Sequence, residues 1–141
     1  MAIFLCLMML GISFFDFRSY LIPDLFHGFL ILGRIFVSAS WQEIGIACLN
    51  GSSVALPLYL LCRIMKQIMH QECMGGGDIK LMFSLGLYFD PYQILLALML
   101  ACASGLILSL FYLKKQKYLI PFGPCICLGF FIVMLLEGRM F

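Results

Sequence analysis

Charged residues are scarce in this chain. Asp, Glu, Lys and Arg make up 11% of its 141 residues, apolar residues make up 64%, and the mean hydropathy is +1.08. Soluble domains contain about 25% charged residues, and a soluble fold of this length could not bury so much apolar surface. The composition therefore indicates a single membrane-embedded domain, spanning residues 1–141, whose outer surface is solvated by lipid.

The sequence also lacks the usual patterns for metal sites and disulfides. Its seven cysteines are an odd number, lie mostly in apolar stretches and include no CxxC pair, so we expect them to pack as small apolar side chains. Cys125 and Cys127 give only a weak metal signal, and His27 and His70 belong to no HExxH motif. There is no G-x-S-x-G motif and no basic run with interleaved aromatics. We expect no cofactor, no metal and no nucleic-acid partner.

The apolar N-terminal run is expected to remain as a first helix. Residues 2–15 are apolar, but no Lys or Arg precedes them and no A-x-A-like cleavage site follows, unlike in a signal peptide. The first basic residue, Arg18, comes after the run. This order favours an N-terminus on the outer side of the membrane.

Six apolar segments can be recognised along the chain. They cover residues 1–15, 22–38, 44–62, 79–89, 92–113 and 119–136. A helix needs about 20 residues to cross a bilayer, with a range of about 17–25, and all segments but the fourth can reach that length. The pattern predicts an all-α fold, a bundle of six transmembrane helices with a short fourth helix.

The short fourth segment begins at an aspartate. Residues 78–89 would form about 18 Å of helix at about 1.5 Å per residue, whereas the hydrocarbon core is about 30 Å thick. Because Asp90 precedes a proline and predicts a turn at one face, we expect Asp78 inside the membrane profile, in a cavity that admits water. Three glycines, at 75–77, end the polar connection 63–77, which we expect to be flexible.

Basic residues are distributed unequally between the two predicted sides. With the N-terminus outside, seven fall on one side and two on the other, and the side richer in Lys and Arg is normally cytoplasmic. We therefore expect a multi-pass protein of the inner or plasma membrane with both termini outside. The larger group is Arg18, Arg63, Lys66, Lys80, Lys114, Lys115 and Lys117, and the smaller group is Arg34 and Arg139.

The same topology brings two aspartates to one membrane edge. Asp16 ends the first segment, Asp78 opens the fourth, 62 residues later, and both fall on the cytoplasmic side. Ionisable groups at membrane depth are costly and usually mark a function. Two adjacent carboxylates can share one proton, so that one draws a proton from an attacking water while the other donates to the peptide carbonyl or the leaving amine. The sequence leaves open which of the two holds the proton.

Three short motifs resemble those of the type IV prepilin peptidases, which are GxGD-type membrane aspartic proteases. Residues 16–24, D-F-R-S-Y-L-I-P-D, resemble the first signature of this family. Residues 75–80, G-G-G-D-I-K, resemble its G-x-G-D signature with the usual lysine, and residues 121–124, P-F-G-P, resemble a third motif near the start of the last helix. The order, the spacing and the six segments match the peptidase core over essentially the whole chain.

The resemblance implies an aspartic endopeptidase. Its substrate would be a prepilin-like precursor with a short basic leader before an apolar helix, cleaved at the cytoplasmic face. Many bacterial members carry an N-terminal region with paired CxxC motifs linked to methylation of the new N-terminus. Because this chain starts at the first core helix and has no CxxC, we expect a short form without N-methyltransferase activity. The implied catalytic pair is Asp16 and Asp78, and the implied supporting residues are Gly75, Gly77, Lys80, Pro23 and Asp24.

Several of these residues also have simpler interpretations. Asp16 could merely mark a helix end, and Asp24 could be a favourable charge at a helix start that also competes for the first catalytic position. Lys80 could be an interfacial anchor. Arg34 could extend towards the membrane surface or pair with Glu43.

Two other functions stay open at this point. A small proton-coupled transporter or channel would also place acids inside a helix bundle, although it would need an ionisable path across the whole membrane. A non-catalytic membrane component of pilus assembly is the third hypothesis. Besides the prepilin-like substrate, the expected partner is the lipid bilayer, and the oligomeric state is not predicted.

Overall fold

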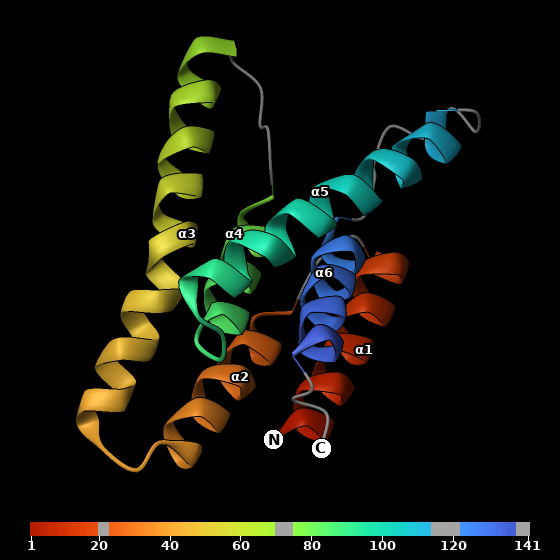
Figure 1. Cartoon of the computed structure of the whole chain (residues 1–141). Helices are drawn as coiled ribbons and strands as arrows, with labels where there is room; N and C mark the ends of the chain where they lie inside the picture. Colours follow the sequence, from red (N-terminus) through yellow and green to blue (C-terminus); the bar gives the residue numbers. More distant parts are fainter. Residues whose placement is uncertain (20–22, 70–74, 114–121, 138–141) are drawn as a thin grey trace. The chain divides into compact units, whose positions relative to one another are not determined.

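The computed structural model of the chain describes residues 1–19, 23–69, 75–113 and 122–137. Within these residues it contains six α-helices and no strand, which confirms the all-α prediction (Figure 1). The helices are α1 (Ala2–Ser19), α2 (Asp24–Val37), α3 (Trp41–Met69), α4 (Gly76–Gly86), α5 (Pro91–Leu113) and α6 (Gly123–Leu136).

The helices divide between two compact units. The first unit consists of Met1–Phe26 and Leu95–Phe141, and the second of His27–Ile94. The first unit therefore contains α1, α6 and most of α5, and the second contains α3, α4 and most of α2. The single domain expected for the chain stays a prediction.

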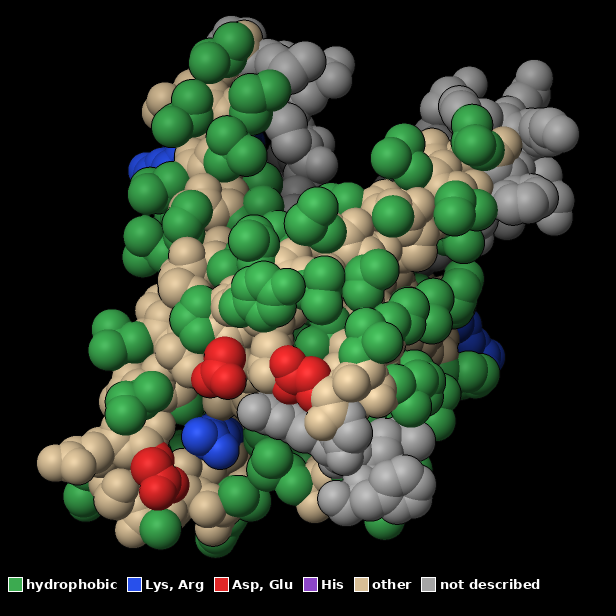
Figure 2. All heavy atoms as spheres, in the orientation of Figure 1, with side chains coloured by type: hydrophobic (Ala, Val, Ile, Leu, Met, Phe, Trp, Pro, Cys, Tyr) green, Lys and Arg blue, Asp and Glu red, His purple; other side chains and the backbone are tan. Residues whose placement is uncertain are grey.

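Two of the described helices have the length and composition to cross a membrane. They cover Trp41–Ile68 in α3 and Pro91–Leu110 in α5, with mean hydropathies of 1.6 and 2.2. Both helices carry many exposed large apolar side chains, and Figure 2 shows hydrophobic groups spread widely over the visible face. Helix α6 is apolar but has 14 residues. The structure thus supports a membrane protein, while the six-span bundle stays a proposal.

Helix α3 is longer than its apolar segment. It continues through Arg63 and Lys66 to Met69, so the prediction of a flexible connection from Arg63 onward is wrong for residues 63–69. Arg, Met, Lys and Gln are good helix formers, and no Gly or Pro interrupts them. The remaining part of that connection, 70–74, lies outside the described residues. Hydropathy indicated where the helix surface becomes polar, but it did not indicate where the helical backbone conformation ends.

Glu43 lies in the first turn of α3, where it forms hydrogen bonds with the residues that precede the helix. Its carboxylate accepts a hydrogen bond from the Ala39 backbone N–H at 3.0 Å, and its own N–H donates to the Ser40 hydroxyl at 3.4 Å. These contacts resemble a capping box, in which side chains satisfy the free amides at a helix start. The guanidinium of Arg34 lies instead over the Tyr88 ring, 5.9 Å from its centroid. Among the described residues, the observed contacts of Arg34 and Glu43 are thus with other groups, and no ion pair between the two is seen.

Helices α3 and α4 pack through two glycines in the second unit. A Cβ atom added to Gly51 would lie 2.9 Å from the Phe83 carbonyl oxygen, and one added to Gly86 would lie 2.9 Å from the Gly51 Cα. Small residues allow such close approach of helix backbones in membranes. Because α4 runs antiparallel to α3 (Figure 1), this contact fixes how far along α3 the short helix lies.

Hydrogen bonds attach α2 to α4 and to the turn that follows it. The Nδ1 atom of His27 lies 3.2 Å from the Ser84 hydroxyl oxygen, and both side chains are buried. The Tyr88 hydroxyl donates to the Leu30 carbonyl oxygen at 2.6 Å. Within the second unit, α4 is therefore held on one side by close glycine packing and on another by polar contacts.

In the first unit, α6 packs against both α1 and α5. The α5 contact passes through Gly129, because a Cβ there would overlap the Ala97 carbonyl oxygen and lie 3.2 Å from the Ala101 nitrogen. The α1 contact brings the last turn of α1 to the first turn of α6. Asp16 lies at this second contact.

Candidate active site

Asp16 lies in the last turn of α1 and is buried. Its side chain is only 5% exposed, and the helix continues three residues past it to Ser19. Its Oδ2 atom accepts a hydrogen bond from the Gly123 backbone N–H at 3.0 Å. A carboxylate in apolar surroundings needs such a donor, because a buried polar group without a partner is costly. Asp16 is therefore held by the backbone of α6 and does more than mark the end of α1.

The start of α6 needs an acceptor from elsewhere in the chain. Phe122 occupies the capping position and has no side-chain oxygen, and Pro124 has no N–H. The first backbone amides of a helix have no partner within the helix. Asp16 provides that partner for Gly123, and the aligned peptide dipoles at a helix N-terminus also favour a nearby carboxylate.

Asp78 lies in the first turn of α4. The helix begins at Gly76, and Gly75 before it has extended backbone angles, with φ −64° and ψ 138°. The Asp78 N–H donates to the Gly75 carbonyl oxygen at 3.1 Å. A Cβ added to Gly75 would lie 3.4 Å from Asp78 Oδ2, whereas one added to Gly76 would meet nothing within 4 Å. Gly75 therefore leaves one side of the Asp78 carboxyl group open, and it is not required for an unusual backbone conformation.

The packing of α4 on α3 sets the level of Asp78. Gly86 lies against Gly51, and Asp78 comes eight residues before Gly86, about 12 Å along the helix at about 1.5 Å per residue. On the antiparallel α3 this is roughly the level of Tyr59, about one turn before Arg63. Figure 1 shows α3 continuing past the start of α4. Asp78 thus lies beside α3, at a level that comes before the polar C-terminal end of that helix.

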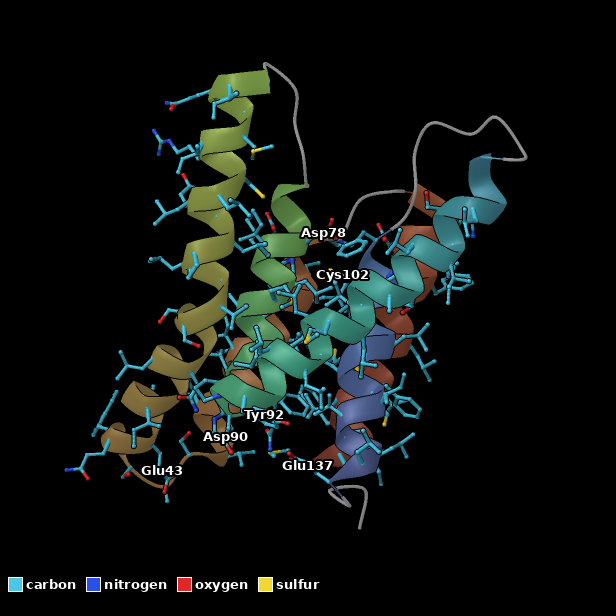
Figure 3. All side chains as sticks on the ribbon, turned by 45° about the horizontal axis from the view of Figure 1, so that its top comes forward. Glu43, Asp78, Asp90, Tyr92, Cys102 and Glu137 are labelled. Carbon is cyan, nitrogen blue, oxygen red and sulfur yellow. The ribbon has the colours of Figure 1, made fainter. Side chains whose placement is uncertain are left out.

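Two other acids lie at the opposite end of this unit. Figure 3 shows Asp78 at one end of α4, with Asp90 and Glu43 beyond the other end. Asp90 precedes Pro91, the first residue of α5. The Asp90 backbone N–H donates a hydrogen bond to Gln93 Oε1 at 2.9 Å, so the Gln93 side chain caps the start of the helix. This arrangement agrees with the predicted turn at Asp90. Asp78 is thus separated along this unit from Asp90 and Glu43, and their assignment to opposite membrane sides stays a prediction.

Pro23 and Asp24 lie at the start of α2. Asp24 is exposed and is the first residue of the helix, and the Pro23 carbonyl oxygen accepts a hydrogen bond from the Phe26 N–H at 3.1 Å. A carboxylate in the first turn interacts favourably with the helix dipole. This position supports the simpler interpretation of Asp24, and Asp16 is the more buried of the two candidates for the first catalytic position.

The remaining predicted residues lie beside Asp78. Gly77 and Lys80 belong to the first two turns of α4, and the Lys80 side chain is exposed. The structure therefore groups Gly75, Gly77, Asp78 and Lys80 in the second unit. Asp16, Pro23 and Asp24 belong to the first unit. The meeting of Asp16 with Asp78 stays a prediction.

The Gly123 amide was missed by sequence reasoning. The P-F-G-P motif was noted only for its resemblance to a family motif near the start of the last helix, and Pro121 lies outside the described residues. The donor is a backbone group 107 residues from Asp16, so no side-chain pattern reveals it. Within the described part of the chain, no cluster of three His, Cys, Asp or Glu side chains could hold a metal ion.

Comparison with known proteins adds an independent finding. Residues 3–110 match the type IV leader peptidase family. The chain is 29% identical over 132 residues to a prepilin leader peptidase/N-methyltransferase of Legionella pneumophila, covering 89% of this chain and 46% of that protein. It is 28% identical over 143 residues to the protein of the same description in Pectobacterium carotovorum, covering 97% and 51%.

A third relative has a different description. It is a type 4 prepilin-like proteins leader peptide-processing enzyme of Escherichia coli O78:H11, 28% identical over 127 residues, covering 86% of this chain and 46% of that protein. The chain thus spans about half the length of these curated relatives. No solved structure matches it significantly.

Proposed function

Because the chain belongs to the type IV leader peptidase family, we propose that it is a membrane aspartic endopeptidase that removes the leader peptide of type IV prepilin-like precursors. The observation that carries this proposal is the family match over residues 3–110, which includes both Asp16 and Asp78. The names of the relatives, which describe prepilin processing, support the substrate class.

The proposed reaction is hydrolysis by water with two acids. One of Asp16 and Asp78 takes a proton from the water as it attacks the scissile carbonyl, and the other donates a proton to the carbonyl oxygen or the leaving amine. The pair needs no metal and no nucleophilic side chain. The Gly123 amide fixes the orientation of Asp16 on α1, while the open side at Gly75 leaves room for substrate beside Asp78.

The proposed site faces the cytoplasm near the membrane surface. The level of Asp78, about one turn below Arg63 on α3, supports a position just inside the apolar layer. A precursor would enter with its apolar helix in the lipid and its leader at the surface. The basic residues Arg63 and Lys66 near the end of α3 would then attract anionic lipid headgroups more strongly than they would attract a basic leader.

For this chain we propose the peptidase step without N-methylation, because its sequence contains no CxxC pair. Mass spectrometry of the processed pilin tests this directly. A methylated new N-terminus produced by the purified protein with S-adenosylmethionine would contradict the proposal, and an unmethylated one agrees with it.

Co-expression with a candidate prepilin tests the catalytic assignment. The wild type should convert the precursor to its mature form, while Asp16→Asn and Asp78→Asn should each abolish conversion at equal protein level. Asp24→Asn is the matched control, because this acid is exposed at the start of α2. Normal processing by either Asp16→Asn or Asp78→Asn would end the two-acid mechanism, and loss of processing only in Asp24→Asn would move the first catalytic position.

One observation makes a second candidate, a proton-coupled transporter, worth testing. Polar contacts recur along the second unit, with His27 against Ser84 and Arg34 against Tyr88. Vesicles containing the purified protein and an internal pH-sensitive dye distinguish the two functions. Proton flux that disappears in Ser84→Ala would favour transport, and absence of flux with intact prepilin processing would favour the peptidase.

A further inference from the structure

The hydrogen bond on Asp16 depends on where α6 begins, and this start is packed against α5. Phe122, the residue before Gly123, lies with its ring against Gly105 of α5. Both residues belong to the same compact unit as Asp16. The contact therefore links α5, the start of α6 and the last turn of α1 in one structural unit.

Gly105 leaves no spare room at this contact. A Cβ atom added there would lie 2.8 Å from Phe122 Cε2, 3.3 Å from Cδ2 and 3.9 Å from the Cys125 sulfur. Non-bonded carbon atoms normally lie about 3.5–4.0 Å apart. Any side chain at position 105 would therefore displace the ring by at least about 0.7 Å, and Cys125 stands close on the same side of α6.

A displacement of that size matters at the next residue. The Gly123 N–H lies 3.0 Å from Asp16 Oδ2, and good N–H···O bonds extend only to about 3.2 Å. The ring can respond by rotating about its own side-chain torsions or by moving the Phe122 backbone with it. In the second case a shift of about 0.7 Å at Gly123 would weaken or break the bond, and misplacements of about 1 Å in an active site can cost about 100-fold in rate.

We propose that Gly105 and Phe122 are positioning residues for the Asp16 carboxyl group, acting through the Gly123 backbone amide. Neither residue touches the reacting atoms. Gly105 permits Phe122 to seat against α5, Phe122 fixes the first turn of α6, and that turn presents its amide to Asp16. The proposal rests on the proposed peptidase function and adds the part of the fold that aligns its first acid.

The test measures steady-state cleavage of a purified prepilin by detergent-solubilised full-length variants. Gly105→Val should lower kcat about 10- to 100-fold and change KM less than about twofold, because Asp16 acts in the chemical step and not in substrate binding. Ala103→Val, on an exposed position of the same helix, is the matched control and should behave as the wild type. Phe122→Leu in combination with Gly105→Val should recover part of kcat relative to Gly105→Val alone, because the shorter side chain removes the overlap while an apolar group remains to pack against α5.

The outcomes separate the two proposals. A wild type that cleaves no prepilin, or an active Asp16→Asn, would remove the proposed function itself. If the wild type cleaves and Asp16→Asn does not, equal kcat values for Gly105→Val and Ala103→Val would overturn only the positioning role. Loss of kcat that Phe122→Leu does not rescue would overturn it as well, since it would reflect general damage to the first unit.

Discussion

Gly51 holds α3 within backbone contact of α4, and its replacement by alanine should loosen the helix pair that carries Asp78. The added Cβ would lie 2.9 Å from the Phe83 carbonyl oxygen and 3.4 Å from Leu87 Cδ2. The first of these neighbours is backbone, so a side-chain rotation cannot relieve it. The two helices must therefore separate by several tenths of an ångström. Overpacking of this kind typically costs about 1–3 kcal/mol.

Gly45 provides a matched control on the same helix. A Cβ at this position would meet nothing within 4 Å. Alanine raises helix propensity over glycine by about 1 kcal/mol at either position, so the difference between Gly51→Ala and Gly45→Ala isolates the contact with α4. That difference should be about 1–3 kcal/mol, or about 5- to 150-fold in the folding equilibrium.

The assay is unfolding of the purified variants in mild detergent by increasing fractions of a denaturing detergent, followed by circular dichroism. Gly51→Ala should unfold at a lower fraction than Gly45→Ala, and its prepilin cleavage should fall because α4 carries Asp78. Equal midpoints for the two variants would refute the close approach of α3 and α4, and with it the level assigned to Asp78.

Three further predictions follow from the described contacts. Tyr88→Phe removes the 2.6 Å hydrogen bond to the Leu30 carbonyl and should lower stability by about 0.5–1.5 kcal/mol in the same unfolding assay, whereas Tyr92→Phe, at an exposed position, should have no effect. Ser84→Ala loses the contact with His27 and should lower stability by a similar amount. The variant should retain the rate of prepilin cleavage per folded molecule, and complete loss of cleavage would contradict a purely structural role for Ser84. The chelator EDTA should leave cleavage unchanged, and inhibition that added Zn²⁺ reverses would contradict the metal-free mechanism.

The helices could be predicted where local signals agree. The short α4 follows from glycines before Asp78 and the turn before Pro91, and the start of α5 follows from proline at the first helical position. The end of α3 could not be predicted from hydropathy, because Arg63 and Lys66 interrupt the apolar run without interrupting the helix. Polarity reports the membrane boundary, whereas backbone propensity sets the helix boundary.

The sequence predicted those parts of the site that are marked by side chains in recognisable motifs. Asp16 and Asp78 stand in recognisable motifs, but the Gly123 amide is a backbone donor and carries no side-chain signature. Gly51 and Gly105 follow no evident sequence pattern either, because their role depends on the helix that each one faces. Contacts between distant segments determine these roles, and one sequence does not show which segments meet.

The polar contacts of the second unit are better explained as links between helices than as a proton path. The Leu81 carbonyl oxygen of the same helix lies 3.2 Å from the Ser84 hydroxyl and provides a backbone acceptor for it. Asp78 precedes Ser84 by six residues, about 9 Å along the helix, which is well beyond hydrogen-bond reach of about 3.2 Å. Tyr88 similarly directs its hydroxyl proton to a backbone carbonyl of α2. Ser84 and Tyr88 each have a backbone acceptor, and the His27–Ser84 and Tyr88–Leu30 contacts hold α2 to α4 and to the turn after it. These contacts are therefore explained by packing of the helices without a proton path.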